Sequence, residues 1–470
     1  MPKTKSSFGK NTALMAVSKF SAQFASLIVI PIYTRLIDPA DYGFVDLALT
    51  YVGILAPLIA LSFDMGIFRF LIDARGNRQS ITAVISSAFK LLLPLLSSLA
   101  IVSIVINYFI GIRFGWLIII NAIVAIIAGV VSQIMRGLGN NKDFTISSIL
   151  SALLMIIVAA FTVIWLDLGA AGILAAAIAS STVTLFYSFI RLKLHRYIVW
   201  RTANRQLQRK LLKYSLPLIP EGVLWWIMQA SDRTIISIVL GLAANGIYAV
   251  ANRIGAIVNG FVSILWMSWT QSSAEEIDSP HAANFFSKIG NEYYIRLLGS
   301  ICILLIPTVS LLFDLLIGQE YIEAYQYVPG IVVAAFGSGL LGFVAAIYNA
   351  KKMTKELAAT TIVPAIINLI TNITLINFIG LWAAVLSTII SYYVMFIWRY
   401  LSIKKIINIQ FKPKDLVITS AVFTTVSALY YWNNPLGNAV SLLIAISASL
   451  ALNSTLLKQG FHLLFSSSHK

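Results

Sequence analysis

Charged residues are scarce in this sequence. Only 11% of its 470 residues are Asp, Glu, Lys or Arg, and 59% are hydrophobic, whereas a soluble domain typically carries about 25% charged residues. The mean hydropathy is +0.86. This composition excludes a series of soluble domains and predicts a polytopic membrane protein.

Residues that carry covalent or metal chemistry are also few. Cys302 is the single cysteine, which excludes an intramolecular disulfide and a cysteine-based metal site. The four histidines are scattered, and the sequence contains no Ser-His-Asp arrangement, His-x-x-x-His pair or phosphate-binding loop. We therefore predict that the protein is not an enzyme and that it uses no cofactor and no bound metal.

Long apolar segments, in contrast, recur from one end of the chain to the other. A transmembrane helix needs about 20 predominantly apolar residues, and fourteen segments qualify, of which the last two are short. Helices are expected because a segment in lipid must satisfy its own backbone hydrogen bonds. The predicted spans are residues 11–36, 42–66, 80–109, 115–135, 144–166, 170–192, 214–240, 243–271, 287–317, 326–349, 357–378, 380–401, 415–432 and 437–457.

The excess of basic residues predicts the orientation. The net charge is +16, and 27 of the 34 Lys and Arg lie in connections on the side of the N-terminus, against only Arg35 and Arg113 on the opposite side. Basic connections remain in the cytoplasm, so we expect both termini there, and the charge gives no reason to invoke nucleic acid. The basic start is followed by an apolar segment that contains Lys19 and lacks a cleavage site, which predicts a retained first span.

A weak internal repeat runs through the sequence. LIDPADYGFVDLA (36–48) and VLGLAANGIYAVA (239–251) match at a shift of 203 residues, which aligns Gly43 with Gly246. A second pair, DLGAAGILAA and FIGLWAAVLS, follows at a shift of 211. The repeat unit holds six spans, an even number, so both copies cross the membrane in the same sense and an axis along the membrane normal would relate them.

These observations predict an all-α polytopic membrane protein of about 14 transmembrane helices, with two six-helix lobes related by a pseudo-twofold along the membrane normal. The predicted parts are an N-terminal lobe at 1–192, a basic cytoplasmic linker at 193–213, a second lobe at 214–405, and two additional helices with a cytoplasmic tail at 406–470.

Several charges lie inside the predicted spans, where each costs about 2.5–3.5 kcal/mol on insertion scales. Arg233 lies ten residues before Ala243 in a predicted hairpin turn and Arg253 lies ten residues after it, so both sit at one depth, about 15 Å from the tip. Function is one explanation for such charges. The candidate substrate-binding residues are Arg253, Lys19, Arg233 and Lys90, and the candidate coupling or ion-pair residues are Asp232, Asp46, Glu221 and Asp64.

Structural explanations for the same residues remain open. A structural ion pair with an arginine explains Asp232 as well as a role in transport does. Arg253 is a better partner for that pair than Arg233, because adjacent residues on a helix do not face each other. Lys90 can extend its amine to the interface. Four tryptophans, Trp225, Trp226, Trp266 and Trp269, fit either stacking on sugars or a place in the core or the interfacial belt.

One long motif resembles a known family. LPLIPEGVLWWIMQASDRTIISIVLGLAANGIYAVANRIG (216–255) is similar to the signature of the polysaccharide exporter family, to which the Wzx-type flippases of O-antigen and capsule lipid-linked oligosaccharides belong within the MOP superfamily. IPIYTRLIDPADYGFVDLA (30–48), MGIFRFL (65–71) and RGLGNNKD (136–143) resemble other segments of that family.

The resemblance implies a flippase that moves an undecaprenyl-pyrophosphate-linked oligosaccharide across the bacterial plasma (inner) membrane by alternating access, driven by a cation or proton gradient. A polysaccharide polymerase and a chain-length regulator are the expected protein partners. The alternative is a cation-coupled multidrug or metabolite exporter of the same fold. Basic residues outnumber acidic ones within the spans, which favours an anionic cargo.

Overall fold

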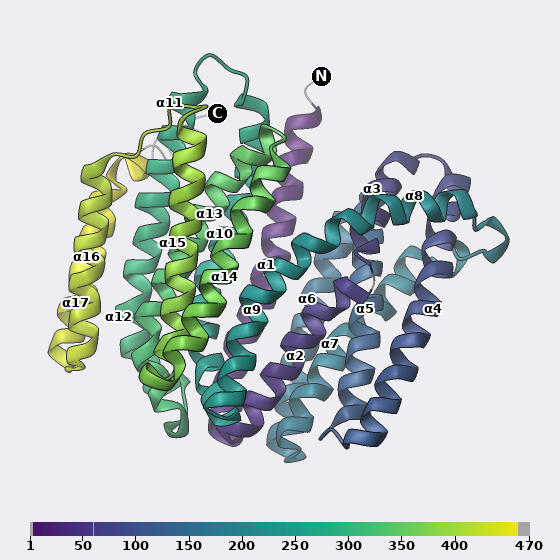
Figure 1. The fold of residues 1–470 in the computed structure, drawn as a ribbon, viewed down its shortest axis with the longest axis horizontal. Helices are drawn as coiled ribbons and strands as arrows, with labels where there is room; N and C mark the ends of the chain where they lie inside the picture. The colour runs from purple at the N-terminus through teal and green to yellow at the C-terminus, as the bar shows by residue number, and fades with distance from the viewer. Residues whose placement is uncertain (1–2, 60, 459–470) are drawn as a thin grey trace, which may run out of the picture. The chain divides into compact units, whose positions relative to one another are not determined.

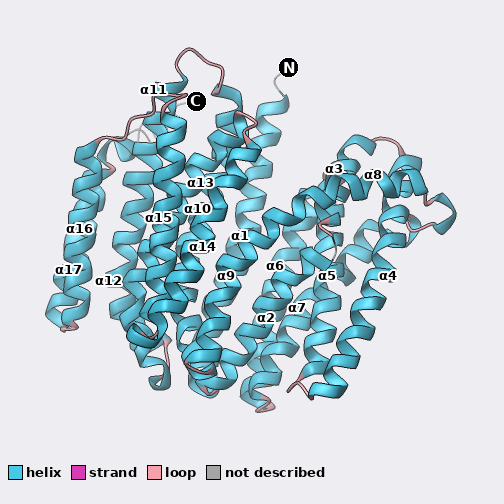
Figure 2. Ribbon diagram, viewed as in Figure 1, coloured by secondary structure: helices cyan, strands magenta, loops and turns pink. Residues whose placement is uncertain are grey.

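The computed structural model describes residues 3–59 and 61–458, and within these residues it is almost entirely helical and contains no strand (Figure 2). Eleven helices of the described part are long and apolar enough to cross a membrane. The prediction of an all-α membrane protein is therefore confirmed. The other three predicted spans fall on helices α2, α9 and α16, which are not among those eleven, so the count of fourteen stays a prediction.

The chain folds into two compact units, Met1–Gly246 and Ile247–Lys470. In the first unit α1 packs on α6, α7 packs on both α5 and α6, and α2 packs on α9. The helices that begin in this unit are α1 (Lys3–Leu36), α2 (Pro39–Ile59), α3 (Phe63–Ala74), α4 (Arg78–Ile110), α5 (Gly115–Gly137), α6 (Asn141–Ala160) with the π-helical η1 (Phe161–Trp165), α7 (Gly169–Leu192), the short 3₁₀ turns η2 (Leu194–Arg196), η3 (Trp200–Thr202) and η4 (Leu216–Leu218), α8 (Arg205–Ser215), α9 (Ile219–Val239) and α10 (Leu242–Glu276).

In the second unit α15 packs against both α13 and α14, while the last two helices pack on each other and on α12. Its remaining helices are α11 (Ala282–Ile289), the π-helical η5 (Gly290–Leu297), α12 (Leu298–Leu316), the 3₁₀ segment η6 (Gln319–Tyr327), α13 (Val328–Ala350), α14 (Thr354–Ile379), α15 (Trp382–Lys404), α16 (Pro413–Trp432) and α17 (Pro435–Leu452) (Figure 1).

The predicted span 42–66 is wrong at its second end. The helix α2 ends at Ile59 and a separate helix, α3, begins at Phe63. Leu61 and Ser62 between them have φ angles of 49° and 51°, a left-handed conformation that an α-helix does not contain. Apolar composition runs unbroken through this break, so hydropathy alone could not place it.

The segment 193–213 was predicted as a linker, and the structure shows that most of it is folded. The helix α8 spans Arg205–Ser215, and its Leu211 is buried. Two serines of α4 fix the preceding turns: the Ser86 hydroxyl accepts a hydrogen bond from Val199 N at 2.9 Å, and the Ser87 hydroxyl accepts one from Asn204 N at 3.0 Å. Because α8 contains four basic residues, its mean hydropathy is low, and its narrow apolar face does not stand out in the sequence.

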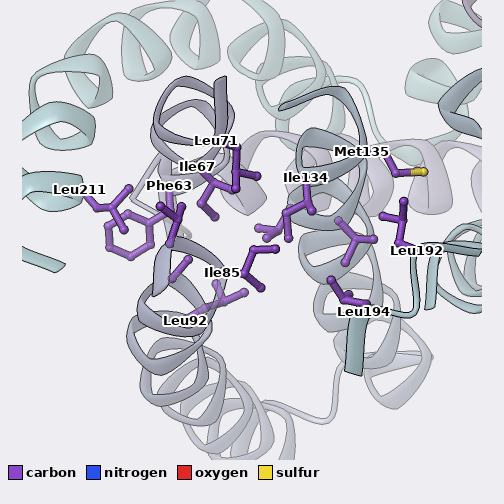
Figure 3. Packing of buried hydrophobic residues seen from close by; sticks show 14 of the residues in the cluster. Phe63, Ile67, Leu71, Ile85, Leu92, Ile134, Met135, Leu192, Leu194 and Leu211 are labelled. Carbon is purple, nitrogen blue, oxygen red and sulfur yellow. The ribbon is translucent and has the colours of Figure 1, made fainter. Parts of the chain in front are cut away.

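Leu211 belongs to a buried apolar cluster that joins α3, the first half of α4, α5 and α8 (Figure 3). Phe63 and Ile67 of α3 and Ile85 of α4 are at most 1% exposed within it. All buried residues of α4 lie between Thr82 and Leu96. The cluster therefore fixes α4 as far as Leu96 and leaves the rest of the helix, up to Ile110, without a buried residue.

We expect Leu211→Ala to destabilise the protein by about 3 kcal/mol, because removing a buried leucine side chain leaves a cavity as well as losing apolar burial. The neighbouring exposed residue gives the control: Lys210→Ala is expected to change stability by less than about 0.5 kcal/mol. Chemical unfolding of the detergent-solubilised protein measures both. Equal stability of the two variants would show that α8 is not packed on α3 and α4.

The second unit uses its tryptophan and arginine side chains to join helices. Trp269 of α10 is 3% exposed, its ring stacks on Phe343 with centroids 5.1 Å apart, and its indole nitrogen donates to the Phe343 carbonyl at 2.8 Å. The sugar-stacking hypothesis is therefore wrong for Trp269, which is a core residue. Arg296 of η5 forms two hydrogen bonds with Asp415 of α16, of 2.8 and 3.0 Å, so the additional C-terminal helices are attached through a largely buried ion pair.

Candidate functional site

The helices α2 and α9 lie side by side in the first unit (Figure 1), and two predicted charged residues meet between them. Arg233 Nε of α9 donates to Asp46 Oδ2 of α2 at 2.7 Å. The side chains are only 20% and 7% exposed. A charge this far from water is tolerated when a close partner neutralises it, so each of these residues explains the presence of the other.

A second polar contact joins the same helices. The hydroxyl groups of Tyr51 on α2 and Thr234 on α9 are 2.6 Å apart. Asp46 and Tyr51 are five residues apart, and their partners on α9 are adjacent. We call the contact formed by Asp46, Tyr51, Arg233 and Thr234 the α2–α9 seam. It is a polar connection between two apolar helices that the predicted repeat assigns to different lobes.

Close backbone contact continues the seam at one end, between the starts of α2 and α10. A Cβ added to Gly43 would overlap the carbonyl oxygen of Leu242, and a Cβ added to Gly246 would overlap the carbonyl oxygen of Pro39. The shift of 203 residues relates Gly43 to Gly246 and also Pro39 to Leu242. The contact is therefore reciprocal, as expected where two copies of a repeat meet across a twofold axis.

The side chain of Asn245 adds a hydrogen bond to this contact. Its Nδ2 donates to the carbonyl oxygen of Gly43 at 2.7 Å, and both groups are buried. Only glycine lets the backbones approach this closely. The predicted repeat identified Gly43 and Gly246 as equivalent, but sequence could not show that they touch each other.

Asp232 and Arg253 lie close in sequence to the seam residues of α9, Asp232 on α9 itself and Arg253 on the following helix, α10. Asp232 precedes the seam arginine on α9 and is 3% exposed, while Arg253 is half-buried on α10. Asp232 belongs to the first unit and Arg253 to the second, so a pair between them stays a prediction. The structure gives the adjacent Arg233 a partner on another helix, as expected from the rule that neighbouring residues do not face each other.

The remaining predicted residues do not share a site with the seam. Lys19 of α1 and Lys90 of α4 are exposed, and Asp64 is half-buried on the separate helix α3. The side chains of Glu221, Trp225 and Trp226 lie outside the described part of the chain. Trp266 is partly exposed.

Sequence reasoning missed a buried polar pair in the second unit. Asn368 and Asn372 lie one turn apart on α14 and are completely buried. Asn368 Nδ2 donates to the Ser387 hydroxyl of α15 at 3.3 Å, and its Oδ1 accepts no hydrogen bond from the described residues. The spacing of two asparagines by four residues within an apolar span was the available signal, because an unsatisfied polar group in such a place is costly.

Solved structures with the same fold are known. The chain is similar to the lipid II flippase MurJ in an inward closed conformation, with 16% identity, a TM-score of 0.67, and coverage of 96% of this chain and 100% of that one. It is also similar to a multidrug resistance MATE family transporter of the MOP superfamily in an inward-facing conformation, with 16% identity, a TM-score of 0.62, and coverage of 83% and 98%. The chain therefore shares its fold with these two membrane proteins.

The family itself follows from the sequence. Residues 8–270, more than half of the chain, match the family described as "Polysaccharide biosynthesis protein". The chain belongs to this polysaccharide biosynthesis family, which confirms the resemblance. No curated protein matches the chain.

Proposed function

We propose that this protein is a flippase that moves an undecaprenyl-pyrophosphate-linked oligosaccharide, a repeat unit of O-antigen, capsule or exopolysaccharide, across the plasma membrane of a bacterium. The observation that carries the proposal is membership of a polysaccharide biosynthesis family together with a fold shared with a lipid-linked substrate flippase. Transport proceeds by alternating access with both termini in the cytoplasm. A polysaccharide polymerase and a chain-length regulator would receive the cargo.

Electrostatics support an anionic cargo. Arg253, Arg233, Lys19 and Lys90 place positive charge within predicted spans, and a cation in a low-dielectric surrounding attracts a pyrophosphate strongly. Arg253 is the residue we assign to the cargo. Arg233 is held by Asp46 in the seam, so its charge is positioned but already partly neutralised.

Coupling to a cation or proton gradient requires a group that binds the ion in one state and releases it in another. Asp46, Asp232, Glu221 and Asp64 are the candidate carboxylates. The buried amide oxygens of Asn368 and Asn372 add neutral oxygen ligands of the kind that hard cations accept.

A cation-coupled multidrug or metabolite exporter is the second candidate, supported by the similarity to MATE transporters. An exporter of cationic drugs would use its carboxylates to bind cargo, whereas the flippase uses its arginines. Drug resistance conferred on a sensitive host would support the exporter.

The decisive experiment varies residue 253. We expect Arg253→Lys to keep part of the transport and Arg253→Gln to lose at least about tenfold, because the loss of one charge-assisted hydrogen bond corresponds to roughly that factor. Flipping of a lipid-linked oligosaccharide in proteoliposomes, and surface polysaccharide in cells at equal expression, are the measurements. Arg69→Gln is the matched control, since Arg69 is exposed beside Asp73. Equal transport by Arg253→Gln and the control would remove Arg253 from the cargo site.

A further inference from the structure

A cavity of about 450 Å³ lies within the first unit between α2, α4 and α5. Nearly all of its lining is aliphatic or aromatic, with Ile59, Leu99 and Ile126 at one end and Phe44, Ile112 and Gly115 at the other. We call it the α2–α4–α5 groove. It exists because the buried cluster fixes α4 only as far as Leu96. The rest of the helix carries no buried residue and leaves a space beside α2 and α5.

The dimensions of the groove match one hydrocarbon chain. A methylene group occupies about as much space as a water molecule, roughly 30 Å³, so the volume holds a chain of about fifteen carbons. From Gly115 to Ile126 the groove follows α5 for about 16 Å at ~1.5 Å per residue. This is the depth of one leaflet, since the whole hydrocarbon core measures about 30 Å. An undecaprenyl chain of 55 carbons would need more than three times the volume.

The end of the groove near residues 111–114 is polar. Asn107 lines it, and its Oδ1 is buried without a hydrogen-bond partner among the described residues. A Cβ added to Gly115 would overlap the Asn107 amide, so the glycine leaves the space that this side chain occupies. An unpaired buried acceptor is costly, and a ligand with an N–H donor would relieve that cost.

An ion pair lies beside this polar end. Arg113 donates two hydrogen bonds to Asp41 of α2, one of them 2.9 Å from Nη2 to Oδ2, and its guanidinium also lies over the ring of Phe114 at 4.7 Å. The side chains of Arg113 and Asp41 are 57% and 28% exposed. An exposed pair is weakly bound, so its two charges can also serve a ligand. One positive and one negative charge side by side complement a zwitterion rather than an anion.

The geometry points to a structural lipid site: the α2–α4–α5 groove holds one acyl chain of a phosphatidylethanolamine molecule from the adjacent leaflet. The lipid phosphate meets Arg113. The ammonium group meets Asp41 and donates to Asn107 Oδ1. Phosphatidylcholine has the same charges but no N–H donor, so the site prefers phosphatidylethanolamine. This inference does not depend on which cargo the protein carries.

The test is a lipid titration of the full-length, delipidated protein in detergent, with adducts counted by native mass spectrometry. The two probes are palmitoyl-oleoyl phosphatidylethanolamine and the phosphatidylcholine with the same acyl chains. We expect the first to bind roughly tenfold more tightly, the factor given by a hydrogen bond to a charged group. Equal binding of the two lipids would overturn the proposed headgroup contacts.

Two adjacent isoleucines of α5 supply a matched pair of variants. Ile119 lines the groove, whereas Ile120 does not line it and is 45% exposed. Ile119→Trp fills the groove and is expected to weaken binding of the first lipid at least tenfold, while Ile120→Trp leaves it unchanged. If the two variants bind lipid alike, the groove is not the site.

Asn107→Leu tests the polar end without filling the groove. It is expected to weaken binding of phosphatidylethanolamine about tenfold, to the level of phosphatidylcholine, and so to remove the preference. A retained preference would assign the headgroup to other residues. An undecaprenyl phosphate that displaces phosphatidylethanolamine one for one, at equal concentration, would instead assign the groove to a prenyl chain and overturn the proposal.

Discussion

Neutralising Asp46 is expected to destabilise the protein by about 3 kcal/mol, the lower end of the cost of breaking a buried ion pair by removing one partner. In Asp46→Asn, Arg233 loses its ion pair with Asp46 while its side chain stays only 20% exposed. Chemical unfolding in detergent measures the change in the free energy of unfolding. The exposed pair of Arg69 and Asp73 provides the control: Asp73→Asn is expected to cost less than about 0.5 kcal/mol.

A double variant separates the structural role of this pair from a role in transport. Asp46→Asn combined with Arg233→Gln removes both charges, so most of the lost stability is expected to return. If the charge of Arg233 also serves the cargo, the double variant folds but transports at least tenfold less. Full transport by a stable double variant would show that the pair only joins α2 to α9. A single Asp46→Asn that is as stable as the unaltered protein would contradict the ion pair itself.

The class of fold could be predicted from the sequence, because each long apolar segment corresponds to a helix or a pair of helices in the structure. The transmembrane class, the helical content and the family were all accessible before any coordinates. Breaks inside apolar segments were not: the division of span 42–66 at Leu61 and Ser62 depends on two backbone angles that composition does not encode. The amphipathic helix α8 was missed for the opposite reason, since its few apolar residues lie among basic ones.

The candidate site was predicted residue by residue but not as an arrangement. Asp46 and Arg233 were each selected because charge is expensive at bilayer depth, yet 187 residues separate them and nothing in the sequence indicated that they pair. Packing made that contact, through the approach of α2 to α9. Packing within the second unit, in turn, places Trp269 in the core, in contact with the rings of Phe286 and Phe343.

The reciprocal glycine contact allows a second test with a large expected effect. Gly43→Ala places a methyl group against the backbone carbonyl of Leu242, and Gly246→Ala places one against that of Pro39. Backbone atoms cannot rotate aside as a side chain can, so the ends of α2 and α10 must separate to reach an ordinary contact distance of about 3.5 Å. We expect each variant to lose about 3 kcal/mol, the upper end of the cost of overpacking.

Spin labels report the separation directly. Cysteines placed at Ala40 and Ala243, two equivalent positions of the repeat, in a Cys302→Ala background give one label pair. Gly43→Ala and Gly246→Ala are each expected to shift the distance distribution to longer values, and by similar amounts because the contact is reciprocal. Gly53→Ala on α2 is the matched control: a Cβ there meets no atom, and alanine favours the helix by up to about 1 kcal/mol. If Gly43→Ala and Gly246→Ala both keep the distance and the stability of this control, α2 and α10 do not meet at their glycines. A shift in only one of them would mean that the contact is not symmetric, and that the two copies of the repeat do not face each other across a twofold axis.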